Sequence, residues 1–289
     1  MPLAAAAYSD DPNPCISNII SYWSIEETGE FKPSVFGQYT AFRESFNDTC
    51  SGLIILDKKP QSITVVFRGT PNYEEFFEHN FNFNEMVPFG AGGKVSKQMF
   101  DGFNKIWLDA GMKNDFLTLK NKYPDYRYNF VGHSLGGAMA SLAVATIVST
   151  GILPSRNVDL TTFGEPRVGD KAFANVLNTI ARQPNGNINS LRVVHNHDII
   201  PHFPPLNSTP YFQHIRELWY PNDMTTADYI DCPYHGYDGG EDATCSDSIP
   251  FKDLKGNEHK FYYNREVSVY GINGCQDLVT TGNVPMATI

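Results

Sequence analysis

Residues 126–148 place a buried strand, a sharp turn and an apolar helix in direct succession, and this order limits the folds open to the chain. The strand reads YRYNFV, the turn reads GHSLGG, and the helix consists mainly of small and apolar residues. A serine on such a turn is held with its hydroxyl exposed above a sheet, where it can act as a nucleophile. Because G-x-S-x-G also arises by chance, the prediction that Ser134 is a nucleophile depends on this setting.

Strand-like and helix-like segments alternate along the chain from residue 53 to about residue 200. The expected strands are 53–56, 63–67, 126–131, 159–163 and 191–194, and the expected helices run from about 103 to 123, over 138–148 and over 171–181. The first two strands are separated by the turn DKKPQS and are expected to pair. Strands that alternate with helices predict an α/β fold with a mostly parallel central sheet and helices on both faces.

The charge of the chain limits its partners. The 289 residues carry a formal net charge of -10, which argues against a nucleic-acid partner and disfavours electrostatic docking on anionic lipid. The longest nearly apolar stretch, 136–148, is too short for a transmembrane segment. The initial MPLAAAA has no basic end and is not a complete signal peptide.

The cysteines fit a secreted protein better than a disulfide scaffold, because there are only five of them. Cys232 and Cys245 flank a loop rich in Asp and Gly and are expected to pair. The other three are Cys15, Cys50 and Cys275. One of these three must stay unpaired. Two glycosylation sequons, NDT at 47–49 and NST at 207–209, also fit a secretory route.

The start of the helix after Ser134 suits a negatively charged oxygen. Its first residue, Leu135, would direct an unpaired backbone N–H and the positive end of the helix dipole at that oxygen. Gly132 and Gly136 have no Cβ atom and let neighbouring elements approach closely. We therefore expect the N–H of Leu135 to form part of an oxyanion hole.

Several separate motifs together resemble the class 3 lipases, which are α/β-hydrolases. The motifs are VVFRGT, VGHSLGGA, TFGEPRVGD, HNHDIIPHFPP, HIRELWY and NEHKFYY, in the order expected of that family. The resemblance runs from about Ala4 to Cys275 and implies one α/β-hydrolase domain over 1–289, with a helical lid and no cofactor. It also implies that Thr70 is the second oxyanion donor. The alternative is that Thr70, followed by Pro71, caps a helix.

The remaining members of a triad follow in the order Ser, acid, His that α/β-hydrolases use. Asp198 comes after the strand at 191–194, at the carboxyl end of the sheet, and its apolar neighbours would leave an unpaired carboxylate poorly solvated. The resemblance makes Asp198 the triad acid and His259, in NEHKFYY, the base. The other histidines after the acid are His202, His214 and His235. Of these, His214 is the alternative base, although it resembles a structural histidine of the family.

Histidines also crowd the segment around Asp198, at positions 195, 197 and 202. One short segment cannot easily supply a tetrahedral ligand set, and no cysteine lies nearby in the sequence. We therefore expect ordinary loop histidines there and no metal site.

Residues 71–81 are predicted to form an amphipathic helix and, by the resemblance, a mobile lid. At helical spacing Tyr73, Phe76 and Phe77 share one face, and three glutamates share the other. Closed, the aromatic face would cover the serine, and open, it would meet lipid. The alternative is a plain amphipathic surface helix.

Three positions depart from the family pattern. They are Phe76 and Phe77, where a lid Trp is usual, Phe100, where a His is common, and Ser9, in place of the cysteine that commonly pairs with Cys275. The first two leave lipid selectivity open, and the third leaves the disulfide map open.

Together these features predict a secreted serine lipase that hydrolyses acylglycerols at a lipid–water interface through an acyl-enzyme. One alternative is a feruloyl-type esterase or a phospholipase on the same triad, because fold and triad do not fix the acyl chain. Another is a lipid-binding protein on a non-catalytic hydrolase scaffold. The sequence does not fix acyl-chain preference, tri- versus partial-glyceride selectivity, interfacial activation or oligomeric state.

Overall fold

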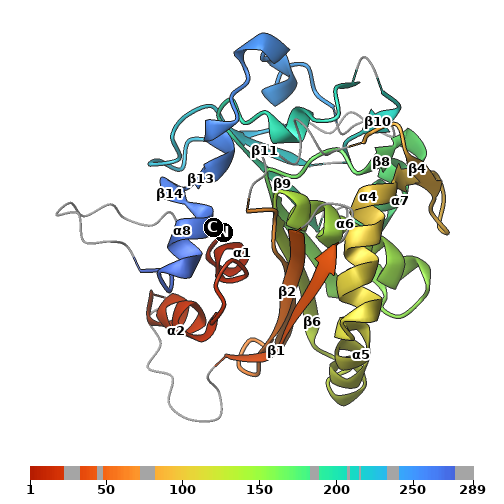
Figure 1. The fold of residues 1–289 in the computed structure, drawn as a ribbon, viewed down its shortest axis with the longest axis vertical. Coiled ribbons are helices and arrows are strands. Elements are labelled where there is room, and N and C mark those ends of the chain that lie inside the picture. Colours follow the sequence, from red (N-terminus) through yellow and green to blue (C-terminus); the bar gives the residue numbers. More distant parts are fainter. Residues whose placement is uncertain are drawn as a thin grey trace.

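A central sheet of eight described strands organises the molecule (Figure 1). The computed structural model describes residues 1–22, 33–43, 48–71, 82–182, 189–206, 209–214, 216–232 and 241–276. In spatial order the strands are β1 (Ser34–Arg43), β2 (Asp48–Asp57), β3 (Ser62–Phe67), β6 (Arg127–His133), β7 (Val158–Phe163), β9 (Ser190–His195), β11 (Glu217–Tyr220) and β12 (Ile230–Asp231). The five strands from β3 to β11 run parallel, and the strands at the two ends pair antiparallel.

Helices lie on both sides of this sheet (Figure 1). One side carries α1 (Pro2–Ala6), α2 (Asn13–Tyr22) and α8 (Val267–Ile272), and the other carries α4 (Lys97–Asn104), the π-helical turn η4 (Lys105–Asp109), α5 (Met112–Lys122), α6 (Leu135–Ser149) and α7 (Lys171–Ala181). The predicted α/β fold with a covered, mostly parallel sheet is therefore confirmed.

The two sides form separate hydrophobic clusters, and a single strand feeds both of them. In β2, Leu53 and Ile55 belong to the cluster under α1, α2 and α8, whereas Ile54 and Leu56 belong to the cluster under α4 to α7. Successive side chains of a strand point to opposite faces, so a continuous apolar run is the expected sequence of a strand covered on both sides.

The remaining described elements are short and lie around the ends of the main sheet. They are β4 (Met86–Pro88), β5 (Lys94–Ser96), β8 (Gly169–Asp170) and β10 (Tyr211–Phe212) in a second sheet, the pair β13 (Phe261–Tyr262) and β14 (Arg265–Glu266), and the 3₁₀ turns η5 (Ser155–Asn157), η6 (Ile200–His202), η9 (Ser246–Ser248), η10 (Phe251–Asp253) and η11 (Asn257–Lys260).

One region differs from the sequence-based expectations, and a second has a structural role that the sequence did not reveal. The helix expected from about 103 to 123 is broken, because Gly111 adopts a left-handed conformation (φ 83°) between η4 and α5. The initial MPLAAAA is structural: its alanines in α1 are fully buried, and a Cβ on Gly271 would lie 1.8 Å from the carbonyl oxygen of Ala5. This close approach between α1 and α8 requires a glycine.

The disulfides resolve the cysteine assignment. Cys232 pairs with Cys245 as expected, and Cys15 pairs with Cys275, with Cα atoms 6.0 and 4.6 Å apart respectively. Cys50 is the unpaired thiol and is buried. The second bridge ties α2 to the chain after α8.

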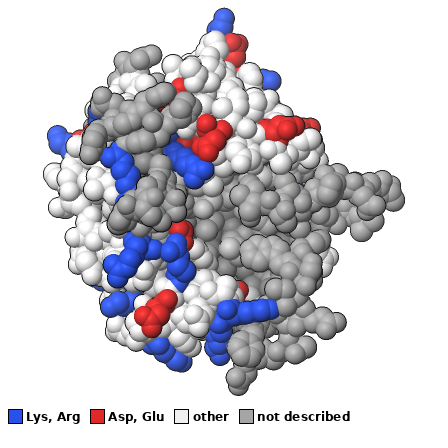
Figure 2. All heavy atoms as spheres, turned by 180° about the vertical axis from the view of Figure 1, so that it is seen from behind, with Lys and Arg blue, Asp and Glu red and all other residues white. Residues whose placement is uncertain are grey.

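The described surface is mixed in charge. Figure 2 shows one face of the molecule, on which Lys and Arg side chains gather over one half, with acidic side chains among them. The net charge of -10 is therefore a poor guide to this particular face. In the described part of the chain, no helix combines the length and apolarity needed to cross a bilayer.

Candidate active site

Ser134 occupies the turn between β6 and α6, as the sequence predicts. Its backbone has φ 59° and ψ -133°, a combination that non-glycine residues rarely adopt. The turn is held from both sides, because the N–H of Ser134 donates to the carbonyl of Phe163 and its own carbonyl accepts from the N–H of Gly137, both at 2.9 Å. Strain of this kind persists only where surrounding structure fixes it, which is characteristic of functional sites.

Glycines make the turn possible. A Cβ on Gly132 would lie 2.1 Å from the carbonyl oxygen of Gly136, and a Cβ on Gly136 would lie 2.1 Å from the carbonyl oxygen of Phe67. Any side chain at these positions would push α6 away from β6 and β3. The hydroxyl of Ser134 is buried and has no hydrogen-bond partner among the described residues. A buried hydroxyl without a hydrogen-bond partner is unfavourable for stability, and its presence here indicates a functional role.

Asp198 and His259 form a buried pair. Asp198 follows β9, His259 lies in η11, and His259 Nδ1 is 2.8 Å from Asp198 Oδ2. Both side chains are fully buried. The pairing places the proton of the imidazole on Nδ1 and leaves Nε2 as the basic nitrogen.

The ends of the central strands bring this pair to the serine. Gly164, directly after β7, has φ 59°, and a Cβ there would lie 2.7 to 2.8 Å from atoms of His259 and Asp198. The preceding carbonyl, of Phe163, holds the N–H of Ser134. The ring of His133 stacks on that of His259 with centroids 4.6 Å apart. All three predicted triad residues therefore lie at the carboxyl ends of β6, β7 and β9.

The two predicted oxyanion residues also lie at this point. Leu135 is the first residue of α6 and is buried. Thr70 is buried in the loop after β3, and a Cβ on the neighbouring Gly69 would lie 2.8 Å from the Cβ of Ser134. The hydroxyl of Thr70 accepts from Arg43 Nη2 at 3.5 Å. The loop after β3 therefore lies against the turn that carries Ser134.

Sequence reasoning missed the partners of the site. The hydroxyl of Tyr262 donates to Asp198 Oδ2 at 2.7 Å, and the N–H of Ile200 donates to Asp198 Oδ1 at 2.9 Å. Tyr262 stands three residues after His259, within NEHKFYY, so its position was a usable signal. The hydroxyl of Tyr8 lies 2.7 Å from His133 Nδ1, but Tyr8 is 125 residues from His133 in the sequence, and no sequence pattern indicates this contact.

Burial and charge fix the protonation of two groups. Burial raises the pKa of Asp198, but His259 and the hydrogen bonds from His259, Tyr262 and Ile200 outweigh it and hold that pKa below its ordinary value. Burial, with a smaller effect from His259, lowers the pKa of His133 to about 3. Asp198 is therefore ionised and His133 neutral near neutral pH.

The other histidines bind oxygen atoms at separate places. His195 Nδ1 lies 2.9 Å from the carbonyl oxygen of Glu258, His197 Nδ1 lies 2.9 Å from that of Asp253, and His202 Nδ1 lies 3.0 Å from Asp247. His214 is buried against Glu165, with Nε2 3.1 Å from Oε2. The group of possible metal ligands found among described residues is Glu217 with Cys232 and Cys245, and its two sulfurs form a disulfide.

The candidate lid lies outside the described residues, apart from Pro71 at its start. The same holds for its aromatic residues, which are Tyr73, Phe76 and Phe77, for His235, and for the two sequon asparagines at 47 and 207.

Comparison with known proteins places the chain among lipases. The family model "Lipase (class 3)" matches residues 64–208. A lipase of Caenorhabditis elegans is 29% identical over 99% of this chain and 83% of its own length. A secreted mono- and diacylglycerol lipase of Fusarium solani is 30% identical over 67% of this chain, and the chain spans only 54% of that relative. The crystal structure of a lipase from Rhizopus microsporus superposes with a TM-score of 0.73 over 92% of this chain and 86% of that one, at 26% identity.

Proposed function

Because this chain belongs to the class 3 lipase family and is an ester hydrolase of that family, we propose that it hydrolyses acylglycerols with Ser134 as the nucleophile. The observation that carries the proposal is the buried pair of Asp198 and His259, beside a strained serine whose hydroxyl has no partner in the described part of the chain. A structural serine would have its hydroxyl bonded and its backbone relaxed.

The reaction proceeds in two balanced halves. In the first, Ser134 Oγ forms a bond to the ester carbonyl carbon while its proton passes to Nε2 of His259. The carbonyl oxygen becomes negative, and we assign its stabilisation to the N–H of Leu135 and to Thr70. The bond to the glyceryl oxygen then breaks, and His259 gives its proton to that oxygen, which leaves as an alcohol.

In the second half, water attacks the acyl-enzyme. His259 takes the proton of the water, the new tetrahedral carbon expels Ser134 Oγ, and the proton passes to that oxygen as the fatty acid is released. Asp198 stabilises the imidazolium that forms in each half without accepting its proton. No step requires a metal or a cofactor.

The proposal also includes a lid, a single domain and an extracellular location. We assign the lid to residues 71–81 within a single α/β-hydrolase domain over 1–289, with Tyr73, Phe76 and Phe77 meeting lipid when it opens. Two disulfides among the described residues and the secreted Fusarium relative support an extracellular location.

The test is a set of initial rates on tributyrin and triolein emulsions and on methyl ferulate, for the wild type and for Ser134→Ala. Rates on both emulsions that fall to background in the variant are expected. Turnover of ferulate alone would replace the lipase proposal by an esterase, and no turnover of any ester by the folded wild type would support a non-catalytic protein. Replacing Phe76 and Phe77 by Ser should lower the rate on triolein more than the rate on a soluble ester.

A further inference from the structure

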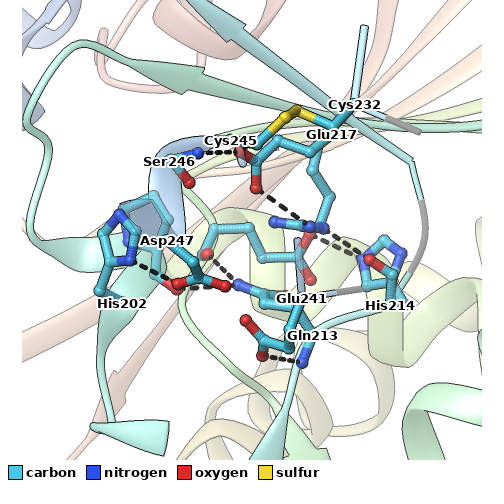
Figure 3. A network of polar contacts seen from close by, with 12 residues as sticks. His202, Gln213, His214, Glu217, Cys232, Glu241, Cys245, Ser246 and Asp247 are labelled. Carbon is cyan, nitrogen blue, oxygen red and sulfur yellow. Dashed lines mark hydrogen bonds and ion pairs between the residues drawn. A yellow bond between two sulfur atoms is a disulfide. The ribbon is translucent and has the colours of Figure 1, made fainter. Parts of the chain in front are cut away.

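A cluster of four ionisable side chains is buried beside the loop that carries Asp198. Its members are Arg167, His202, Glu241 and Asp247, the last three labelled in Figure 3. They come from the loop before β8, from η6, from the loop closed by the Cys232–Cys245 bridge, and from η9 directly after that bridge. Asp247 is the most accessible, with 20% of its side chain exposed, and the side chain of Arg167 is 2% exposed.

Arg167 joins the disulfide-closed loop to the segment that follows Asp198. Its Nε and Nη2 donate to the two carboxylate oxygens of Glu241 at 2.8 and 2.9 Å, and Nη2 also lies 3.2 Å from Asp247 Oδ1. Its Nη1 donates to the carbonyl oxygens of His202 and Pro204 at 2.5 and 3.0 Å. The guanidinium therefore bridges two carboxylates and the end of η6.

The other end of η6 holds the triad acid. The turn begins two residues after Asp198, and its first N–H, from Ile200, donates to Asp198 Oδ1 at 2.9 Å. At the far end of the turn, His202 Nδ1 lies 3.0 Å from Asp247 Oδ1, as Figure 3 shows. Any shift of η6 would therefore move a hydrogen-bond donor of Asp198.

The cluster is balanced in charge only with one extra proton. A single guanidinium faces two carboxylates, because Nη2 of Arg167 lies 2.9 Å from Glu241 Oε2 and 3.2 Å from Asp247 Oδ1. Glu217, the acidic neighbour on β11, is paired with Arg192 at 3.3 Å and brings no net charge. An uncompensated buried charge is costly, and a proton on one of the two carboxylates removes it.

We propose that Arg167, His202, Glu241 and Asp247 form a positioning unit for Asp198 that holds one proton, and that losing this proton as the pH rises through neutrality slows hydrolysis. This inference rests on the proposed role of Asp198. The cluster takes no part in bond making, and it acts through η6 on the hydrogen bonds of the triad acid.

The proton is held near neutral pH. Burial raises the pKa of Glu241 to about 7 against the effect of Arg167, and the hydrogen bond with Asp247 adds to the rise. Burial also raises the pKa of Asp247, but hydrogen bonds with His202 and Glu241 and the charge of Arg167 outweigh it, so this pKa lies below its ordinary range. The pKa of Glu241 is raised in the folded protein. The stabilising contribution of this carboxyl group is therefore complete when the pH is below the ordinary pKa of a glutamate, and it is lost as the pH rises through about 7.

Two isosteric variants separate this account from a purely structural one. Asp247→Asn and Glu241→Gln each leave one carboxylate for Arg167 and remove the need for the extra proton. We expect the alkaline midpoint of kcat on a soluble p-nitrophenyl ester to rise by about one pH unit in each, or roughly tenfold in kcat at the alkaline end, with KM unchanged. The thermal unfolding midpoint of the wild type should decrease as the pH rises from about 5 to about 8. That of each variant should not decrease over this range.

The matched control is Asp231→Asn, which breaks the exposed pair of Arg216 and Asp231 next to the same bridge. It should leave both pH profiles as in the wild type. The double variant Asp247→Asn/Glu241→Gln leaves Arg167 buried without a carboxylate and should lose far more stability than the two single losses added together.

Wild-type pH profiles in both single variants, or an additive double variant, would overturn the inference. These outcomes are distinct from failure of the proposed function. If the wild type hydrolyses no ester, or Ser134→Ala matches it, the function fails, while the pH dependence of the unfolding midpoint still decides whether the cluster holds a proton.

Discussion

Among the described residues, two buried groups each contain a serine, a histidine and an acid, and the two are built in opposite ways. One is Ser134, His259 and Asp198, and the other is Ser141, His214 and Glu165. In the second group Ser141 Oγ donates to Glu165 Oε1 at 2.5 Å, and Glu165 Oε2 accepts from Thr162 at 2.6 Å and lies 3.1 Å from His214 Nε2. That serine stands inside α6, with relaxed helical backbone.

The difference shows that residue types alone do not make a site. In the group of Ser141 the hydroxyl donates its hydrogen to the carboxylate of Glu165, so that hydrogen is not directed at the imidazole of His214. In the group of Ser134 the carboxylate is taken by the histidine and a tyrosine, and the serine hydroxyl has no described partner. The first arrangement stabilises the contact between α6 and β7, and the second leaves the hydroxyl of Ser134 on a strained turn, as its proposed role as the nucleophile requires.

The largest effect is expected from Ser134→Ala. Removing the nucleophile should lower kcat on a soluble ester by about a millionfold, while the unfolding midpoint stays near that of the wild type. Steady-state rates and thermal unfolding measure both. A variant that retained a tenth of the wild-type rate would remove Ser134 from the mechanism.

Asp198→Asn should follow, with a loss of about 10⁴ in kcat, because an amide no longer fixes the tautomer of His259. The lowered pKa of Asp198 gives a pH signature as well. The stabilising contribution of this carboxylate is complete when the pH is above the ordinary pKa of an aspartate. It is lost as the pH falls through the lowered pKa of Asp198 in the folded protein. Acid unfolding of the wild type should therefore steepen only in strongly acidic solution, and the Asp198→Asn variant should lack that part of the curve.

Tyr262→Phe is a smaller test of the same carboxylate. It removes one of the two hydrogen bonds to Asp198 Oδ2 and should lower kcat by about tenfold, equivalent to about 1.4 kcal/mol, with KM unchanged. A change in KM alone would place Tyr262 at the substrate instead. Tyr263→Phe, at the next residue, is the control and should behave as the wild type.

Ser141→Ala is the counterpart of Ser134→Ala and should have the smallest effect on rate. We expect kcat within about twofold of the wild type and a loss of about 1 to 2 kcal/mol in stability, because a buried bond to Glu165 is removed. Chemical denaturation and steady-state rates check this. A large fall in kcat without a change in stability would erase the distinction between the two groups.

Local patterns carried most of what the sequence could predict. The strand, turn and helix around Ser134 are each set by neighbouring residues, and α7 begins and ends where its pattern predicts. β1 was missed because apolar residues, Phe36 and Phe42, occupy exposed positions and a charged residue, Arg43, is buried, so its sequence lacks the apolar–polar alternation of a half-buried strand. The break at Gly111 was missed because apolar spacing continues across it.

Contacts between distant segments could not be read from the chain. The order of residues made His259 a candidate, but its approach to Asp198 depends on how η11 lies against β9. The acids that meet Arg167 are 74 and 80 residues away from it, and nothing in the TFGEPRVGD motif identifies them. Such partners are set by tertiary packing, which leaves no periodic signal in the sequence.

Covalent labelling with an alkyl fluorophosphonate tests the central claim most directly. The reagent forms a stable ester with an activated serine, and intact mass followed by peptide mapping locates it. We predict one label per chain, on Ser134, absent in Ser134→Ala and retained in Ser141→Ala. A label on another serine, or none on a protein that still hydrolyses esters, would contradict the assignment of Ser134, His259 and Asp198.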